Sequence, residues 1–412
     1  MQGGSANNQG SSRILNRRLI VNEVRRAGSI ARSELAELTG LSGAAVTFIT
    51  SELIEEGLLV EDPDAAGQRR RPLSLDYRTH YAIGIKLTEG ELQAVLSDLS
   101  TTVVGRHRRA VDAHQPDEVA TACAELARDL IESTGTPIEK VAGIGLALPG
   151  LIDARQGIVT ESVRIGWHYV PIARLVAERA GLRVWVDNDV NAFALGEHLF
   201  GLGRQAQSVA AMTIGRGVGA GLVVNGAVFR GHRGGAGEIG HIPIAIDGRL
   251  CECGRHGCLE AYVSEPSIVK QLHERSDDYR KCTVEDVLAL AEAGNFDALA
   301  VLDRAGGGLG RGLAALVNMF DPEVLVLGGE GVRFMPYFKK AMTGEFERLA
   351  FGNRRRIDVH EWNDDAWTRG AAGLVVQQFF NFDVPPGVSP IRAAEGEAEP
   401  AGETMELSYR PL

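Results

Sequence analysis

The chain has 412 residues and a formal net charge of −11, long enough for two or three domains with apolar cores of their own. No apolar run approaches the roughly 20 residues that cross a bilayer, and the opening MQGGSANNQGSSR lacks the apolar centre of a signal peptide. Five cysteines, mostly clustered, do not resemble a secreted disulfide framework. We expect a cytoplasmic protein without a membrane partner.

Charge and composition divide the chain unevenly. Residues 1–80 contain ten arginines and ten acidic residues, so the remainder carries the whole negative excess. An acidic body argues against nonspecific nucleic-acid binding by the larger part. Residues 1–12 are rich in Gly, Asn, Gln and Ser, and residues 383–412 in Pro, Gly and Glu. We predict that both ends are disordered tails without a function of their own.

Residues 13–76 predict three short helices and two strands. One apolar face marks the first helix, which Gly28 ends; its members are Ile14, Leu15, Leu19, Ile20 and Val24. The second helix has Ser33 as its expected N-cap and Gly40 as its stop, and the third begins at Ser42. The tight turn TGLS joins these two helices, and two strands around a polar tip follow. This order is typical of a winged helix-turn-helix.

The winged helix-turn-helix predicts contacts with DNA. Its third helix would enter the major groove, and the arginines of the wing would reach phosphates or the minor groove. The predicted contact residues are Ser42, Gly43, Ala44, Thr47, Arg69, Arg70 and Arg71. Because the helix residues are small, specificity would depend partly on DNA shape. The alternative is a dimerising helical bundle whose arginines form a solvated face.

From residue 77 to 382 the pattern becomes α/β. Apolar strands alternate with helices, and two similar units begin at Tyr81 and near Ser208. They predict an internally duplicated, two-lobed clamp, whose hairpins are like those that grip phosphates in actin-like sugar kinases. Ligands in α/β folds lie at the carboxyl ends of strands. Polar residues and glycines gather at those ends in Pro149-Gly150, Asn188-Asp189, Gly215 to Gly219 and Gly328-Gly329.

Three of the five cysteines lie within eight residues. With a histidine upstream, the spacing is His241-x9-Cys251-x-Cys253-x4-Cys258. Three thiolates and an imidazole suit a closed, tetrahedral, structural Zn²⁺ site, with Gly254 and Gly257 allowing the backbone to turn. A disulfide or packed free thiols are the alternatives. Such a site would hold the segment GGAGEIGH and Glu260 in position. Cys123 and Cys282 are interpreted as ordinary buried or partly buried residues in helical segments.

These motifs together resemble a known family. The segments GAGEIGH…CECGRHGCLE, NDVNAFALGE and LALPG resemble the ROK family of repressors, sugar kinases and uncharacterised reading frames, from about Asn16 to Gly373. The resemblance implies a winged helix-turn-helix head followed by a two-lobed, actin-like, sugar-kinase-like body of the duplicated ribonuclease H-like type. Its repressor branch combines these two parts, as this chain does.

The resemblance also implies site residues. His241, Cys251, Cys253 and Cys258 would bind zinc. Sugar hydroxyls would be held in a cleft bordered by Pro149 and Gly150; the implied ligands are Asn188, Asp189, Glu238, His241 and Glu260. Carboxylates are suited to this because they accept paired hydroxyl bonds. In kinase members the residue that matches Asp189 is the general base. Without the resemblance, Asp189 could be a helix N-cap.

The chain departs from the kinase pattern in both phosphate turns. The family's Asp-x-Gly-Gly-Thr is Lys86-Leu87-Thr88-Glu89 here, and its Gly-Thr-Gly is Gly215-Arg216-Gly217. Without the glycines and the aspartate, close phosphate approach and a magnesium anchor are lost. We predict no kinase activity, with Asp189 a vestigial base. The asparagine usual before Gly-Trp is absent from ESVRIGWHY. Lys86 and Arg216 could attract an anionic effector or pair with nearby acids.

The sequence therefore predicts a sugar-responsive repressor of carbohydrate-metabolism genes. A homodimer or homotetramer would bind operator DNA at an inverted repeat, and a sugar or sugar phosphate would alter that binding. One alternative is an active sugar kinase with a fused regulatory head. Another is a DNA-binding scaffold whose pocket is vestigial and whose partner is a protein.

Overall fold

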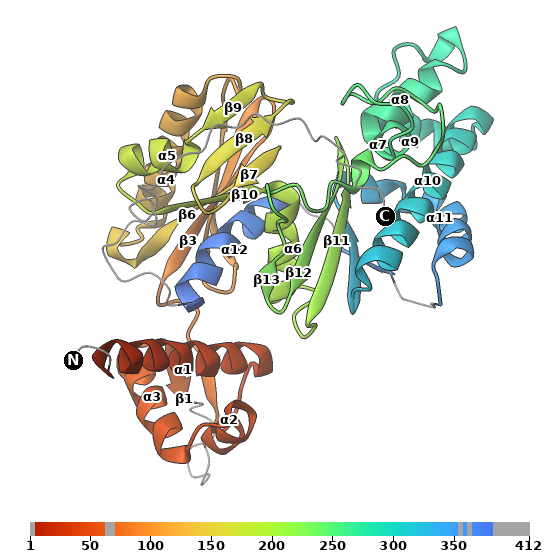
Figure 1. Cartoon of the computed structure of the whole chain (residues 1–412). Helices are drawn as coiled ribbons and strands as arrows, with labels where there is room; N and C mark the ends of the chain where they lie inside the picture. Colours follow the sequence, from red (N-terminus) through yellow and green to blue (C-terminus); the bar gives the residue numbers. More distant parts are fainter. Residues whose placement is uncertain (1–4, 62–70, 353–356, 361–364, 382–412) are drawn as a thin grey trace, which may run out of the picture.

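A computed structural model describes residues 5–61, 71–352, 357–360 and 365–381. Figure 1 shows a small head below two larger lobes. The predicted tail 383–412 and the wing residues Arg69 and Arg70 lie outside the described residues. Helix α1 (Ser5–Ala27) begins inside segment 1–12. Once a helix has formed, each added residue gains one hydrogen bond, so the helix can extend into residues that are poor helix formers.

The head has the predicted order of elements. Helices α2 (Arg32–Thr39) and α3 (Gly43–Glu55) are followed by an antiparallel pair, β1 (Leu59–Glu61) with β2 (Leu73–Leu75). Ser42 is the N-cap of α3, because its hydroxyl accepts from the Ala45 amide at 3.2 Å. The expected N-cap Ser33 is wrong. Helix α2 starts earlier, after Ala31, whose amide donates to the side chain of Glu34.

The predicted apolar face of α1 is buried only in its second half. Ile20 and Val24 are fully buried, whereas Ile14, Leu15 and Leu19 are 43%, 59% and 37% exposed. Where α1 passes the end of α3, the contacts are charged instead of apolar. Arg13 and Arg17 of α1 pair there with Glu52 and Glu56. The amphipathic pattern of the sequence predicts a longer buried face on α1 than the small head can cover.

The body consists of two five-stranded sheets with the same topology. Their orders are β10-β6-β3-β4-β5 and β13-β12-β11-β14-β15. In each sheet the first two strands form an antiparallel hairpin. The first strand also pairs in parallel with a strand that comes later in the chain. The first sheet contains β3 (Tyr81–Leu87), β4 (Glu91–Asp98), β5 (Val103–Ala110), β6 (Val141–Leu148) and β10 (Val184–Asn188). The second contains β11 (Ser208–Ile214), β12 (Val218–Val224), β13 (Ala227–Val228), β14 (Val324–Gly328) and β15 (Ile357–Val359). The predicted duplication and α/β class are confirmed.

Helices and a small sheet cover the outer sides of the two lobes. The first lobe adds α4 (Pro116–Thr134), η2 (Ile138–Lys140), β7 (Leu151–Asp153), β8 (Ile158–Ser162), β9 (Trp167–Val170) and α5 (Ile172–Ala180). The second adds η3 (Ile239–His241), α7 (Glu260–Val263), α8 (Glu265–His273), η4 (Asp277–Tyr279), α9 (Val284–Glu292), α10 (Phe296–Phe320), η5 (Glu330–Phe334) and α11 (Met335–Leu349). Cys123 is buried in α4 as expected, but Cys282 precedes α9 and is not helical. None of the described helices is long and apolar enough to span a membrane.

Two helices lie between the lobes, α6 (Asp189–Phe200) and α12 (Ala366–Asn381) (Figure 1). Helix α12 packs directly on the first sheet, where two strand glycines make room for it. A Cβ on Gly84 would lie 2.0 Å from the Thr368 carbonyl oxygen, and one on Gly145 1.9 Å from that of Ala371. Glycine inside a strand here marks close backbone approach.

The head is joined to the body through α1. Buried residues of α1 and of α12 belong to one apolar core, with Ile20 and Val24 on one side and Val376 and Phe380 on the other. Arg25 of α1 is only 3% exposed, and its guanidinium donates to the Leu199 carbonyl at 2.7 Å. That carbonyl belongs to the last turn of α6. The head and body therefore share both a core and a buried polar contact.

Candidate functional site

The structure brings together the four predicted metal ligands. One ligand atom from each of His241, Cys251, Cys253 and Cys258 lies within 4.8 Å of the others. The Cys251 sulfur is 3.8 Å from His241 Nδ1, and the sulfurs of Cys253 and Cys258 are 3.7 Å apart. These residues form a cluster that could hold a metal ion, and no disulfide joins them.

The separations fit a tetrahedral ion. Zn–S bonds of about 2.3 Å place neighbouring sulfurs about 3.8 Å apart at the tetrahedral angle. Gly254 and Gly257 adopt φ values of 82° and 80°, as expected from their role in the turn. At Gly257 a Cβ would also meet the Ala245 carbonyl oxygen at 2.0 Å. Burial raises the pKa of the Cys251 thiol to about 12, so a cation would be needed to keep it ionised near neutral pH.

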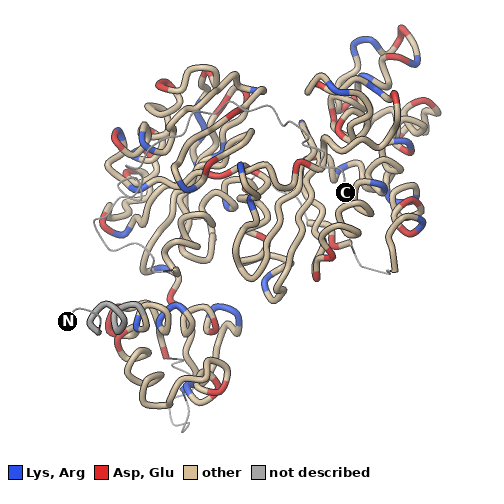
Figure 2. Tube along the Cα trace, in the orientation of Figure 1, with Lys and Arg blue, Asp and Glu red and all other residues tan. Residues whose placement is uncertain are grey.

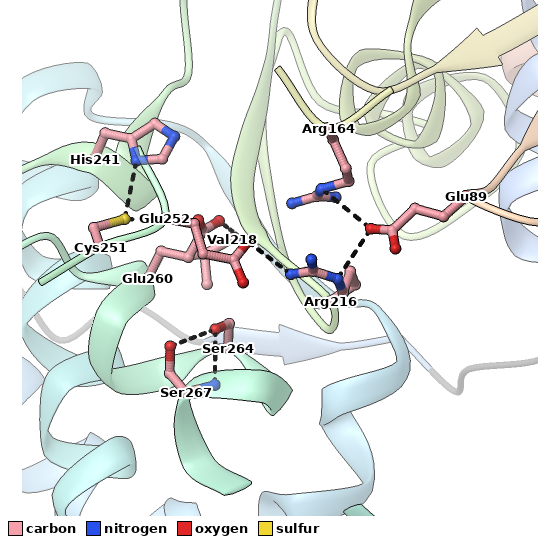
Figure 3. Close-up of polar contacts among 10 residues, drawn as sticks. All are labelled: Glu89, Arg164, Arg216, Val218, His241, Cys251, Glu252, Glu260, Ser264 and Ser267. Carbon is pink, nitrogen blue, oxygen red and sulfur yellow. Dashed lines mark hydrogen bonds and ion pairs between the residues drawn. The ribbon is translucent and has the colours of Figure 1, made fainter. Parts of the chain in front are cut away.

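Glu260 lies between the cysteine cluster and the β11–β12 turn. Its side chain is buried at the start of α7. One carboxylate oxygen accepts from the Val218 amide at 2.9 Å, at the end of the β11–β12 turn, and the other lies 3.9 Å from the Cys251 sulfur. Figure 3 shows this arrangement of Glu260 between Val218 and Cys251. The cysteine loop therefore positions the turn as well as the carboxylate.

The acidic residues predicted to bind sugar converge. Glu238 is 45% exposed, and its pKa is raised because surrounding protein removes water from its carboxylate. Repulsion from Glu260 and Asp189 raises this pKa further, whereas His241 and Arg164 oppose the shift. His241 directs Nδ1 to the cysteines, while Nε2 lies 3.8 Å from Glu238. His241 therefore lies between the cysteines and Glu238.

Asn188 has a structural role beside its predicted contact with sugar. Its side-chain oxygen accepts from the Val190 and Asn191 amides at 2.9 and 3.4 Å, which makes Asn188 the N-cap of α6. Its side-chain amide donates to the Gly150 carbonyl at 3.1 Å. The alternative that Asp189 is the N-cap is wrong, because the cap lies one residue earlier. The turn after Pro149 is thereby attached to the start of α6.

Lys86 is a buried cation that contacts Asp189. The ammonium of Lys86, at the end of β3, forms an ion pair with Asp189. Both side chains are largely buried, at 9% and 14% exposed. The ammonium also lies 4.9 Å from the centre of the Trp367 ring, whose indole donates to Glu330 at 2.8 Å. These groups lie where the two halves of the body meet.

The two hairpin turns are joined to each other by ion pairs. Arg216, in the β11–β12 turn, donates to Glu89 of the β3–β4 turn at 3.1 Å and to Glu252 of the cysteine loop at 2.9 Å. Arg164 lies 3.8 Å from Glu89. Figure 3 shows both arginines directed at the same carboxylate oxygen of Glu89. Of the two sequence alternatives for Lys86 and Arg216, pairing with acids is confirmed.

Sequence reasoning missed several of these partners. Glu252 and Arg164 stand in quoted motifs but were given no role, and Trp367 was not considered. The buried Asp187 accepts from Arg230 at 2.8 Å and from the Asn191 side chain at 3.0 Å. Its place directly before Asn188, at the end of a buried strand, was the available signal. Its partner Arg230 is distant in sequence, and no sequence signal pointed to it.

The predicted DNA-contacting residues lie on an open surface of the head. Ser42, Gly43, Ala44 and Thr47 are exposed along the start of α3. Arg71, at the edge of the wing, is 52% exposed and 3.3 Å from Glu61. Basic and acidic residues are interspersed over the head in Figure 2.

One surface hollow lies away from these groups. It has a volume of about 800 Å³ and is lined by residues of the β4–β5 region and α4, including Asp112, Asp117 and Glu125. None of the predicted sugar or metal ligands lines it. The candidate site lies elsewhere, where the carboxylates, His241 and the cysteine cluster converge.

A winged helix-turn-helix head on a duplicated, sugar-kinase-like body defines a DNA-binding transcriptional regulator. The ROK family model matches residues 82–378, and the chain belongs to this family. A winged helix-turn-helix DNA-binding model matches residues 15–60. Both matches agree with the division into head and body.

Two curated relatives are regulators. The chain is 26% identical over 373 residues to a xylose repressor of Bacillus subtilis, with 89% of this chain and 96% of that protein covered. It is 31% identical over 313 residues to the DNA-binding transcriptional dual regulator NagC of Escherichia coli, with 74% and 77% covered.

Solved structures include both branches of the family. A ROK family transcriptional regulator, described as a homologue of the Escherichia coli MLC protein, has a TM-score of 0.79 at 26% identity and covers 90% of this chain and 97% of its own. A ROK glucokinase from Streptomyces griseus, in complex with glucose and AMPPNP, has a TM-score of 0.62 at 26% identity, with 71% and 98% covered.

Proposed function

We propose that the chain is a sugar-responsive transcriptional repressor that binds operator DNA through α3 and the wing. The observation that carries this proposal is the direct pairing of Arg216 with Glu89 across the two hairpin turns. In a kinase of this fold those turns hold nucleotide phosphates. A side-chain bridge between them supports a body that senses a sugar and does not phosphorylate it. The xylose repressor and NagC similarities support the same function.

The effector in this proposal is a neutral sugar. Glu238, Asp189 and Glu260 supply hydroxyl acceptors, while His241 and Asn188 supply further polar groups beside Pro149 and Gly150. Lys86 and Arg216, the cations that could receive a phosphate, are already paired with carboxylates. A sugar phosphate would have to separate these pairs in a cleft that is already acidic, which disfavours it.

In this proposal Zn²⁺ holds the cysteine loop. His241, Cys251, Cys253 and Cys258 would bind it, and the closed four-ligand set gives it a structural role. The ion would fix Glu260 and the Nε2 side of His241 toward the sugar. The donor set and its spacing support this assignment.

The proposed route from sugar to DNA is α6. Asn188 and Asp189 lie at its start, and its last turn accepts the buried guanidinium of Arg25 from the head. Twelve helical residues span about 18 Å as one rigid element. Carbonyls at a helix C-terminus carry partial negative charge, and a cation there is favourable. A sugar-induced shift of α6 would therefore move the helix that carries the DNA-binding head.

Calorimetry and gel-shift experiments on the full chain test this function. A panel of neutral sugars and their 6-phosphates is titrated, and operator DNA is obtained by selection from random duplexes. We expect one neutral sugar to bind, to release the DNA, and to bind better than its phosphate. A homodimer on an inverted repeat is the expected complex. DNA affinity that no sugar changes would overturn the proposal.

The alternative activity, a sugar kinase, is tested by a coupled ATP assay on the same sugars. Retention of Asp189 and the glucokinase similarity are the observations that favour it. We expect no turnover with the sugar that binds. Turnover would show that the Arg216–Glu89 bridge opens to admit nucleotide.

A further inference from the structure

Helix α3 exposes an unusual surface for a helix that enters a DNA groove. Its sequence GAAVTFITSELIE contains no Lys, Arg, His, Asn or Gln. The bidentate hydrogen bonds that most often discriminate bases come from Arg, Lys, Asn and Gln. The charged residues of α3 are all acidic, so this helix cannot make those contacts. Specificity from α3 must depend on other chemistry.

The exposed stripe of α3 is apolar and includes a phenylalanine. Ala44, Thr47, Phe48 and Ser51 are spaced so that they share one helical face, and all four are exposed. Phe48 is 59% exposed, although its neighbours Val46 and Ile49 are buried. The Thr47 hydroxyl donates to the Gly43 carbonyl at 2.8 Å, which turns its polar atom toward the helix backbone. Apart from the Ser51 hydroxyl, this face presents methyl groups and aromatic carbon.

A cation accompanies the exposed ring. The guanidinium of Arg13, from α1, lies 5.9 Å from the centre of the Phe48 ring and pairs with Glu52. Arg13 is itself 57% exposed. An aromatic ring next to an accessible cation suits DNA, because the ring can contact a base edge while the cation contacts the adjoining phosphate. This charge complementarity favours DNA over an uncharged apolar partner.

We infer that Phe48, with Ala44 and the Thr47 methyl group, reads the C5-methyl groups of thymines in the operator. Thymine is the base that presents a methyl group in the major groove, and apolar side chains recognise it there. Phe48 is thus a specificity-determining residue, whereas Arg13 contributes affinity without sequence preference. This inference rests on the proposed DNA-binding function and adds the chemistry of the recognised base.

The test uses the full chain and a duplex selected from a random library. Each thymine of the selected half-site is replaced in turn by deoxyuridine, which lacks only the C5-methyl group. At one or two positions in each half-site we expect binding to weaken about fourfold, since one buried methyl group contributes about 0.8 kcal/mol. In Phe48→Ala the same replacements should have no effect, and Phe48→Leu should retain part of it.

Two further variants distinguish thymine recognition by Phe48 from a general loss of DNA binding. Phe296→Ala removes another exposed ring, 80% exposed and in the body, and should leave all DNA affinities unchanged. Arg13→Ala should weaken binding to every sequence equally while the uracil penalty remains. Because Phe48 is exposed, its variants should keep the wild-type unfolding midpoint, which is measured alongside.

Two outcomes would overturn the inference while leaving the proposed function intact. One is a uracil penalty that is equal in wild type and Phe48→Ala, or absent at every selected thymine. The other is a change in oligomeric mass in Phe48→Ala, which would assign the ring to a subunit contact. Failure to select or bind any duplex would instead contradict the DNA-binding function itself.

Discussion

The proposed sugar side and the proposed nucleotide side of the body place their charges differently. On the proposed sugar side, Glu238, Glu260 and His241 gather beside the His/Cys₃ cluster. On the proposed nucleotide side, Arg216 and Glu89 pair across the two hairpin turns. Acceptors that gather in one place suit a neutral sugar, whereas turns joined by an ion pair are less suited to hold a phosphate.

The largest expected effect is on the sugar side and follows from loss of the metal. Cys258→Ser should remove a ligand from the closed cluster, release the bound ion and loosen Glu260. We expect metal content to fall well below one per chain and sugar affinity to fall on the order of 10- to 100-fold. Elemental analysis and calorimetry measure both. Cys282→Ser, outside the cluster, is the control; unchanged sugar affinity in metal-free Cys258→Ser would contradict the positioning role.

The next effect lies at the boundary of the two sides. Lys86→Met leaves the Asp189 carboxylate without its ion-pair partner in a largely buried place. We expect the free energy of unfolding to fall by about 2 kcal/mol, less than for a fully buried pair because some solvent contact remains. The double variant Lys86→Met/Asp189→Asn should recover much of this in urea unfolding. Lys140→Met, an exposed lysine, serves as the control, and equal losses in the single and double variants would argue against the pair.

A smaller effect on stability, with a specific loss of signalling, is expected at the far end of α6. Arg25→Ala removes a buried charged donor from the Leu199 carbonyl and should cost about 1.5 kcal/mol. Sugar and operator should each still bind, but sugar should no longer weaken operator binding, which a gel shift with and without sugar reveals. The neighbouring Arg26→Ala, 36% exposed, should respond normally. A full sugar response in Arg25→Ala would exclude α6–Arg25 as the route.

The smallest effect is expected on the nucleotide side. The Arg216–Glu89 pair is partly exposed, at 43% and 52%, so Arg216→Gln should change stability by less than about 1 kcal/mol. The difference should shrink in high salt, since exposed pairs are screened. In a Glu89→Gln background, Arg216→Gln should cost less than it does in the wild type, because one of the two partners of Arg216 is already removed. An equal cost in both backgrounds would show that Arg216 and Glu89 do not stabilise each other.

Local signals in the sequence were enough to predict the head, the two related units of the body and the His/Cys₃ cluster. The alternation of strands and helices and the cap Ser42 follow from periodicity and stop residues that act within a few positions. The cysteine cluster was predictable because three of its ligands are close in sequence and glycines permit the turn. Ser33 was wrong as a cap because α2 starts two residues earlier, after Ala31, whose amide donates to Glu34. Residue type alone does not decide between these two starts.

The partners of the charged residues were decided by the tertiary structure. Lys86 and Asp189 are 103 positions apart, Arg216 and Glu89 are 127 apart, and Arg25 and Leu199 are 174 apart. Each of these side chains had several possible partners in the sequence, and only the packing of α6 and the two hairpins selects one. The sequence by itself determined the elements, the duplication and the donor set of the metal cluster, because these depend on neighbours along the chain. Pairing across the cleft and attachment of the head depend on distances that only the folded chain sets.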